Sequence, residues 1–218
     1  MRLLAPLAAA VLALSSSAAA APPEPRRPAE IFVGLGTGNA VCDKEKPDSD
    51  CAVDKAGAAV SLGGAWRFHR HWAVGLELAI WGYNVRDSWK GKLADAATDV
   101  SISSSYVAPF ARWYWFGKGS ADAYLQLGLG LSGVKATAKN AGGEYEGNWS
   151  GVAVPIGIGA EWYVTRWLRL GPQALAYLHR STRVCETANG RETCRDAGKD
   201  EALLAWRILV LSATVTFG

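Results

Sequence analysis

The chain has 218 residues and nearly balanced charge, with 23 Lys and Arg against 20 Asp and Glu. This length suits one domain of ordinary size. Charges of both signs are mixed within each polar segment and no polybasic arm is present, so the charge pattern gives no reason to expect nucleic-acid binding.

The N-terminus predicts an export signal over residues 1–21. Arg2 provides the positive region, Leu3–Leu14 the apolar region, and Ser15–Ala21 the small residues of a cleavage site. The apolar run is shorter than the ~20 residues of a membrane-spanning helix, which disfavours the alternative of an uncleaved anchor. Residues 22–30 are rich in proline and predict an extended periplasmic leader.

Residues 31–218 alternate apolar side chains with small or polar ones. In Tyr124–Gly133, four leucines fall on one face of a strand, and glycines with small polar groups fall on the other. A glycine-rich face suits the crowded interior of a small barrel, with the leucines in lipid. The predicted strands are Ile31–Gly38, Gly57–Arg67, Trp72–Tyr83, Val100–Phe116, Tyr124–Gly133, Trp149–Tyr163, Trp167–His179 and Leu203–Phe217.

The connections between these eight segments alternate between long and short. This rhythm predicts an all-β fold, an eight-stranded antiparallel transmembrane up-and-down β-barrel with short periplasmic turns and four longer extracellular loops. The predicted loops are Cys42–Lys55, Asn84–Asp99, Lys135–Asn148 and Ser181–Glu201. Pro109 and Pro155 interrupt predicted strands, where we expect local irregularities because proline cannot donate a ladder hydrogen bond.

The strand alternation assigns aromatic and charged residues to opposite faces. The predicted periplasmic aromatic girdle, on the lipid face near the short turns, consists of Trp66, Trp72, Trp113, Trp162 and Phe217. The predicted interior polar network consists of Glu77, Arg112, Gln126, Glu161, Arg169 and Gln173. Interior charges must be paired, since an unpaired buried charge costs several kcal/mol.

With its strand rhythm, its interior Glu/Arg set and its terminal Thr-Val-Thr-Phe alternation, the chain resembles the small OmpA/OmpX-type outer-membrane barrels. The resemblance covers 31–218. It implies a monomer in a Gram-negative-type outer membrane, in contact with membrane lipid or lipopolysaccharide. In such proteins an aromatic C-terminal residue helps recognition by the barrel assembly machinery; here Phe217 precedes Gly218.

The interior network allows two interpretations. A static polar plug is favoured, because barrels of this size enclose little more than their own side chains; an ion-pair gate in a narrow pore is the alternative. We therefore expect a non-enzymatic role in envelope integrity or surface contact, and second a pathway for ions or small solutes. No cofactor is expected.

The four cysteines predict structural disulfides in an oxidising compartment. Local pairs Cys42–Cys51 and Cys185–Cys194 are the simplest connectivity, and bridges between the first and last loops remain possible. A metal site is disfavoured because these loops lack histidine and tight Cys-x-x-Cys spacing. Asp43, Glu45, Asp48 and Asp50 lack the spacing of a calcium loop and indicate a solvated surface.

Two weaker patterns are also present. His179-Arg180-Ser181, with Glu192 as the acid, is similar to the His-x-Ser of lipid A deacylases, a third functional hypothesis. The alternation turns His179 inward, away from lipid. Gly64-Ala65-Trp66 is similar to the lipocalin Gly-x-Trp, but it ends the second strand, and the predicted interior is polar.

Overall fold

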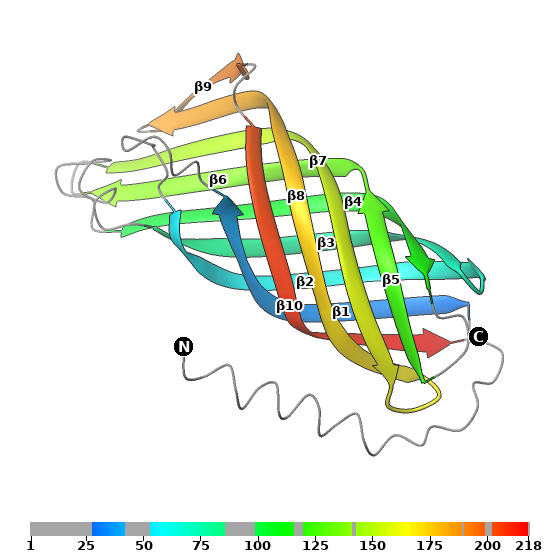
Figure 1. Cartoon of the computed structure of the whole chain (residues 1–218). Helices are drawn as coiled ribbons and strands as arrows, with labels where there is room; N and C mark the ends of the chain where they lie inside the picture. Colours follow the sequence, from blue (N-terminus) through cyan, green and yellow to red (C-terminus); the bar gives the residue numbers. More distant parts are fainter. Residues whose placement is uncertain are drawn as a thin grey trace.

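The computed structural model describes residues 28–41, 53–85, 99–115, 120–140, 143–188, 190–198 and 202–217. These residues fold almost entirely into antiparallel strands (Figure 1). The strands are β1 (Ala29–Val41), β2 (Val53–His69), β3 (Trp72–Val85), β4 (Asp99–Tyr114), β5 (Ala121–Gly128), β6 (Gly130–Asn140), β7 (Gly143–Tyr163), β8 (Leu168–Ala188), β9 (Arg191–Asp196) and β10 (Ala202–Phe217). None of the described residues belongs to a helix long and apolar enough to cross a membrane.

The pairings form a ring of eight strands, which confirms the predicted fold class. β5 and β6 are two parts of one strand, because both pair with β4 and with β7 in a single register. The ladder then runs from β7 through β8 and β10 to β1, and from β1 through β2 and β3 back to β4. β9 is an additional strand that pairs with the end of β8.

The interruption between β5 and β6 has a cause in the sequence. It falls at Leu129, which lies opposite Pro109 of β4, and the adjacent Gly128 lies opposite Pro155 of β7 in the same registers. Neither proline has an N–H to donate to the ladder. The irregularity expected at the two prolines is therefore a single local break between them.

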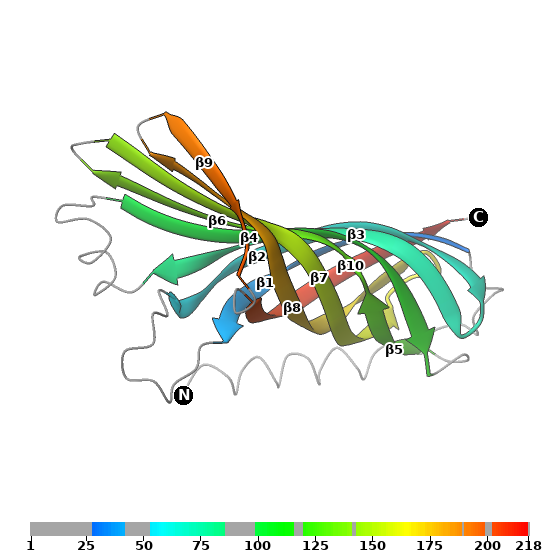
Figure 2. The same ribbon diagram turned by 90° about the horizontal axis from the view of Figure 1, so that it is seen from above.

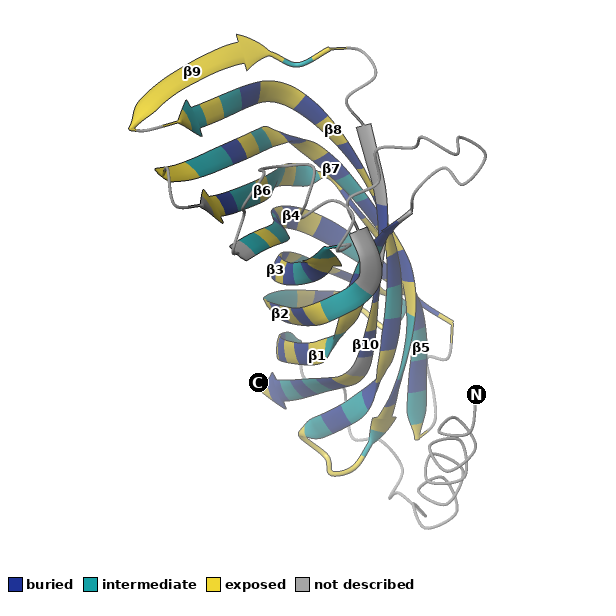
Figure 3. Cartoon of the chain, turned by 90° about the vertical axis from the view of Figure 1, so that its left-hand side faces the viewer, coloured by how far each residue is buried: buried dark blue, intermediate teal, exposed yellow. Residues whose placement is uncertain are grey.

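Burial alternates along each strand around the barrel, as the banding in Figure 3 shows. In the strand that contains β5 and β6, Leu125, Leu127, Leu129 and Leu131 are exposed. Tyr124 and Gln126, on the other face, are fully buried. The same outward apolar rows recur on neighbouring strands and form a belt, which we call the apolar belt. A continuous belt of exposed apolar side chains is unfavourable in water and is stable against lipid.

The two ends of the barrel differ. Short turns at residues 70–71 and 164–167 lie at one end, where the start of β1 pairs with the end of β10 (Figure 1). This is the periplasmic end by the rule for such barrels. β1 begins at Ala29, so Glu30 belongs to the barrel and not to the predicted leader.

At the opposite end several strands continue beyond the barrel (Figure 2). β6 and β7 pair as far as Asn140 and Gly143, so the predicted loop Lys135–Asn148 is mostly a β-hairpin. The predicted loop Ser181–Glu201 likewise contains the end of β8 and all of β9. We call the projecting parts of β6, β7 and β8, together with β9, the extracellular sheet.

β10 contains a bulge that changes its alternation. Its ladders with β1 and with β8 both shift by one residue at Val210. On the β8 side the shift lies opposite Pro172, which cannot donate a hydrogen bond. An uninterrupted alternation along Leu203–Phe217 predicts Leu209 on the lipid face together with Leu211 and Phe217. That prediction is wrong, because the bulge turns Leu209 inward and leaves it fully buried.

Candidate functional site: the barrel lumen and the extracellular sheet

The described part of the lumen holds equal numbers of acids and arginines. Among the described residues, the buried acids are Glu30, Glu77, Asp122 and Glu161, and the buried arginines are Arg67, Arg112, Arg169 and Arg207. Each of these side chains is at most a few per cent exposed. Buried ions persist only where other charges and hydrogen bonds compensate them, so the four-to-four balance satisfies a physical requirement of this interior.

The periplasmic half of the lumen is organised around Arg169. Its guanidinium lies 2.8 Å from Glu30, 3.1 Å from Asp122 and 3.2 Å from Glu161. Arg67 shares this group of acids, at 2.8 Å from Asp122. Hydroxyls complete the carboxylate bonding: Tyr114 donates to Glu30, Tyr163 to Asp122 and Thr214 to Glu161. We call this set the Arg169 cluster.

The middle of the lumen is spanned by a second chain of contacts. Arg207 donates to one oxygen of Glu77, and the Gln126 amide donates to the other at 2.7 Å. The Gln126 carbonyl oxygen in turn accepts from Arg112 at 2.8 Å and from Gln173 at 3.1 Å. The structure thus divides the six predicted network residues between two clusters: Glu161 and Arg169 lie in the first, and Glu77, Arg112, Gln126 and Gln173 in the second.

Arg112 departs from the expectation that every interior charge has an opposite partner. Among the described residues, no carboxylate lies within ion-pair distance of it. Its guanidinium carbon lies instead 4.3 Å from the ring centre of Phe32, 4.8 Å from that of Phe110 and 4.4 Å from that of Tyr124. A desolvated guanidinium between aromatic faces is stabilised by cation–π attraction.

Glycines make room for this aromatic cage. A Cβ at Gly63 would lie 2.2 Å from the Phe32 ring, and one at Gly159 would lie 2.3 Å from the Tyr124 ring. A Cβ at Gly75 would lie 2.6 Å from Phe110. The glycine-rich inner face therefore leaves room for these large rings around Arg112.

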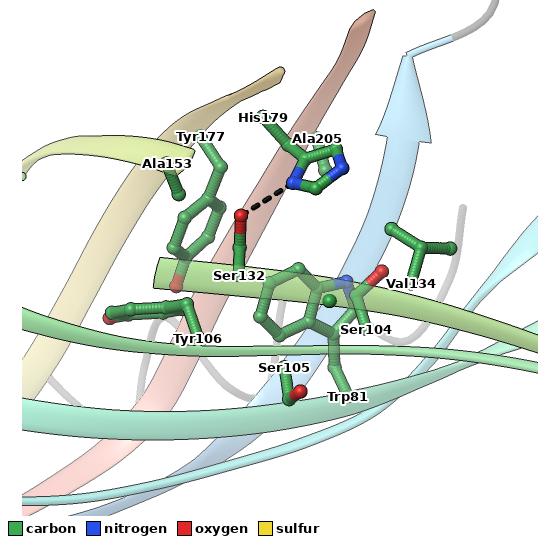
Figure 4. Close-up of a pocket in the computed structure, with 11 residues that line it drawn as sticks. Trp81, Ser104, Ser105, Tyr106, Ser132, Val134, Ala153, Tyr177, His179 and Ala205 are labelled. Atoms are coloured by element: carbon green, nitrogen blue, oxygen red, sulfur yellow. Dashed lines mark hydrogen bonds between the residues drawn. The ribbon is translucent and has the colours of Figure 1, made fainter. Parts of the chain in front are cut away.

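An aromatic layer lies on the extracellular side of these clusters. Trp81 stacks on Tyr177 with ring centres 4.8 Å apart, and Tyr106 lies 4.9 Å from Tyr177. The Trp81 indole donates to the Tyr83 hydroxyl, which is 2.9 Å from Ser104. The small cavity among these side chains has a volume of about 10 Å³, enough for one water (Figure 4). The described side chains at this level therefore leave little room between them.

His179 lies beside this cavity, inside the barrel. Ser132 hydrogen-bonds to its Nδ1, and Ser181 lies 3.0 Å from its Nε2 (Figure 4 shows the Ser132 contact). His179 is 5% exposed, and no carboxylate in the described part of the chain hydrogen-bonds to it. Glu192 lies on β9 and is exposed. Chemistry on a membrane lipid would require His179 on the opposite side of the barrel wall.

The predicted girdle residues all have exposed side chains, from 54% for Trp66 to 37% for Trp113 and Trp162. Trp72 and Phe217 are also exposed, and all five lie near the periplasmic end of their strands. Trp115, Val164 and Trp167, which the sequence pattern did not single out, are exposed at the same end. Aromatic side chains at this level favour the lipid headgroup region.

One disulfide joins β8 to β9 in the extracellular sheet. Cys185 and Cys194 are directly opposite in the ladder and are bonded, as the local connectivity predicted. Both thiols are thereby used, so the group Cys185, Glu192 and Cys194 has only a carboxylate left to offer a metal. Cys42, Cys51 and the acids at 43–50 lie outside the described residues.

Of the eight buried charges among the described residues, the sequence pattern predicted four. Arg207 was overlooked because the bulge at Val210 reverses the alternation that Leu211–Phe217 suggested. Glu30 lies within 22–30, which the sequence predicts as the leader, but it belongs to β1. Arg67 and Asp122 occupy inward positions next to Trp66 and Ala123, so the alternation already contained a signal for them.

No protein-family profile and no curated protein matches the sequence. The fold is similar to that of several solved structures. Neisserial surface protein A has a TM-score of 0.54 at 11% identity, over 87% of this chain and 97% of that one. Ail of Yersinia pestis has a TM-score of 0.55 at 13% identity, over 88% of this chain and 99% of that one. A major outer membrane protein of Thermus thermophilus has a TM-score of 0.57 at 11% identity, over 87% of this chain and 99% of that one.

At these identities the likeness concerns the fold. It agrees with the ring of eight strands, the apolar belt and the polar lumen. The lipocalin alternative is wrong, because its apolar interior and polar exterior are the reverse of what the structure contains. The chain has the fold of the small eight-stranded outer-membrane barrels of the OmpA/OmpX type.

Proposed function

We propose that the chain is a non-enzymatic outer-membrane protein that makes surface contacts through its extracellular sheet. The observation that carries this proposal is the continuation of β6, β7, β8 and β9 beyond the apolar belt. β9 is exposed at every position, and the Cys185–Cys194 bond holds it against β8. Exposed elements on a rigid scaffold are the usual site of contact with other molecules.

The filled lumen supports the same proposal over the alternative of a pore. The Arg169 cluster and the aromatic layer occupy successive levels of the barrel, and the cavity between the aromatic side chains holds about one water. A conducting pathway would require several buried ion pairs to separate, each at a cost of several kcal/mol. The inward position of His179 argues against the third hypothesis, a lipid A-modifying enzyme.

Removal of the extracellular sheet's outer hairpin tests the proposal. Arg183 and Asp196 are directly opposite, so replacing 184–195 with Asn-Gly would close the strands with a two-residue turn. We expect cells that produce this variant to adhere to a cultured cell monolayer several-fold less than cells that produce the full chain. Equal adhesion, at equal amounts of heat-modifiable protein in the outer membrane, would contradict the proposal.

A further inference from the structure

The disulfide of the extracellular sheet has a carboxylate beside it. Glu192 and Cys194 are two residues apart on β9, so their side chains project from the same face of the sheet. Cys185 lies directly opposite Cys194 on β8 and shares that face. The two sulfur atoms and a carboxylate oxygen of Glu192 all lie within 4.8 Å of one another. The ladder thus brings together three side chains that can ligate a metal ion, which the spacing along the sequence alone did not indicate.

This disulfide is accessible from solution. Cys194 is exposed and Cys185 is partly buried. β9 is exposed at every position, as Figure 3 shows, and it lies at the end of the sheet, where among the described strands it pairs with β8 alone. A thiolate from solution can therefore reach a sulfur atom of the bond. While the bond is intact neither sulfur is a thiolate, so only the Glu192 carboxylate is available to a metal.

We propose that reduction of the Cys185–Cys194 bond by a low-molecular-weight thiol converts this group into a binding site for one zinc ion. One external thiolate attacks Cys194 Sγ, and the Cys185 thiolate leaves. A second external thiolate attacks the external sulfur of the mixed disulfide, and the Cys194 thiolate leaves. The cysteines gain two electrons, and two molecules of the external thiol are oxidised to their disulfide. The two thiol protons pass to the cysteine sulfurs and then to solvent when the metal binds.

Two thiolates and a carboxylate select zinc over the hard divalent ions. Zinc prefers thiolate sulfur and also accepts carboxylate oxygen, whereas calcium and magnesium take oxygen ligands. Zinc–sulfur bonds of ~2.3 Å and zinc–oxygen bonds of ~2.0–2.2 Å place tetrahedral ligand atoms roughly 3.5–3.8 Å apart. The side chains reach this geometry by rotation once the sulfurs separate, because the three ligand atoms already lie within 4.8 Å. A water completes the tetrahedron, and the bound zinc ties β8 to β9 in place of the disulfide.

Cobalt(II) is the probe for this site, because its visible spectrum reports tetrahedral coordination by thiolates. The test uses the full chain in detergent micelles with Cys42→Ser and Cys51→Ser, so that Cys185 and Cys194 are its only cysteines. We expect no tetrahedral cobalt spectrum while the disulfide is intact. After reduction and removal of the reductant, one cobalt ion should bind per chain, and zinc should displace it.

Two carboxylate variants distinguish the ligand from its neighbour. Glu192→Gln should weaken cobalt binding by the reduced chain about tenfold or more, because one of three protein ligands loses its charge. Asp196→Asn is the matched control. Asp196 shares the same face two residues beyond Cys194, but it lies opposite Arg183 and outside the group of three ligands. Its variant should bind cobalt like the reduced parent chain.

Trypsin digestion provides a second readout. In the reduced chain, zinc should slow cleavage after Arg191 and Arg195 relative to the same chain in a chelator, because the metal holds β9 to β8. Heat-modifiable migration confirms that each sample contains a folded barrel. A folded, reduced chain without a tetrahedral cobalt spectrum would overturn the proposal. The same spectrum from the oxidised chain, or equal binding by the Glu192→Gln and Asp196→Asn variants, would overturn the assignment of these ligands.

Discussion

The lumen and the extracellular sheet differ in how their charged side chains are compensated. Both are rich in charges, but Arg169 in the lumen contacts three carboxylates, whereas Arg180, Arg183 and Arg191 outside the belt are exposed. Water compensates an exposed charge, while a buried charge must be compensated by the protein itself. The interior charges therefore stabilise the barrel, whereas the exposed charges outside it can contact other molecules. The predictions below test that difference.

The largest effect is expected from Arg169→Met. The change leaves Glu30, Asp122 and Glu161 with Arg67 as the only other arginine of their cluster, so we expect a loss of about 3–5 kcal/mol in the free energy of unfolding. Urea unfolding in lipid vesicles, followed by heat-modifiable migration, measures it. Leu127→Met on the lipid face is the control. A loss below about 1 kcal/mol would mean that the Arg169 cluster does not need its central cation.

A smaller effect is expected from Arg112→Met. This side chain contacts rings and Gln126, so its removal strands no directly paired carboxylate, and the loss reflects cation–π attraction of about 2 kcal/mol. The same urea series measures the loss. If it equals that of Arg169→Met, the aromatic cage does not differ energetically from the ion-pair cluster.

The smallest effect on the barrel is expected from replacing both Cys185 and Cys194 with serine. The bond joins β8 to β9 outside the apolar belt, so the free energy of unfolding of the barrel should change by less than about 0.5 kcal/mol. Trypsin should cut the variant faster at Arg191 or Arg195, because only the ladder then holds β9 to β8. A large loss of barrel stability would show that the extracellular sheet and the barrel unfold as one unit.

The sequence predicted the barrel well because lipid imposes a period of two on every spanning strand. Tyr124–Gly133 shows this directly, with exposed leucines alternating with more buried neighbours. The same signal fades outside the membrane, where water accepts polar side chains on both faces of a hairpin such as Lys135–Asn148. The alternation also fails at Val210, because a bulge changes the alternation without changing the composition. The inward position of Arg207 was not predicted for that reason.

The interior could be predicted only in part. The alternation identified Glu77, Arg112, Gln126, Glu161, Arg169 and Gln173 as inward, but it could not predict which of them would meet. Register determines those contacts, and Arg112 shows the consequence, since its partners are rings on β1, β4 and β5 and not a carboxylate. A rule that interior charges must pair is too narrow where glycines let aromatic rings approach a cation.

Current across a planar lipid bilayer tests the central claim most directly. Among the described residues, a charge-balanced network and an aromatic layer lie in the lumen. If they act as the plug that we propose, the full chain, inserted and folded, should pass no stepwise current in salt solution. Trp81→Ala together with Tyr177→Ala should leave the membrane silent, because the Arg169 cluster and the Glu77–Arg207 pair still block the barrel. Regular conductance steps from the unmodified chain, altered by Glu77→Gln, would contradict this account and identify the network as a gate.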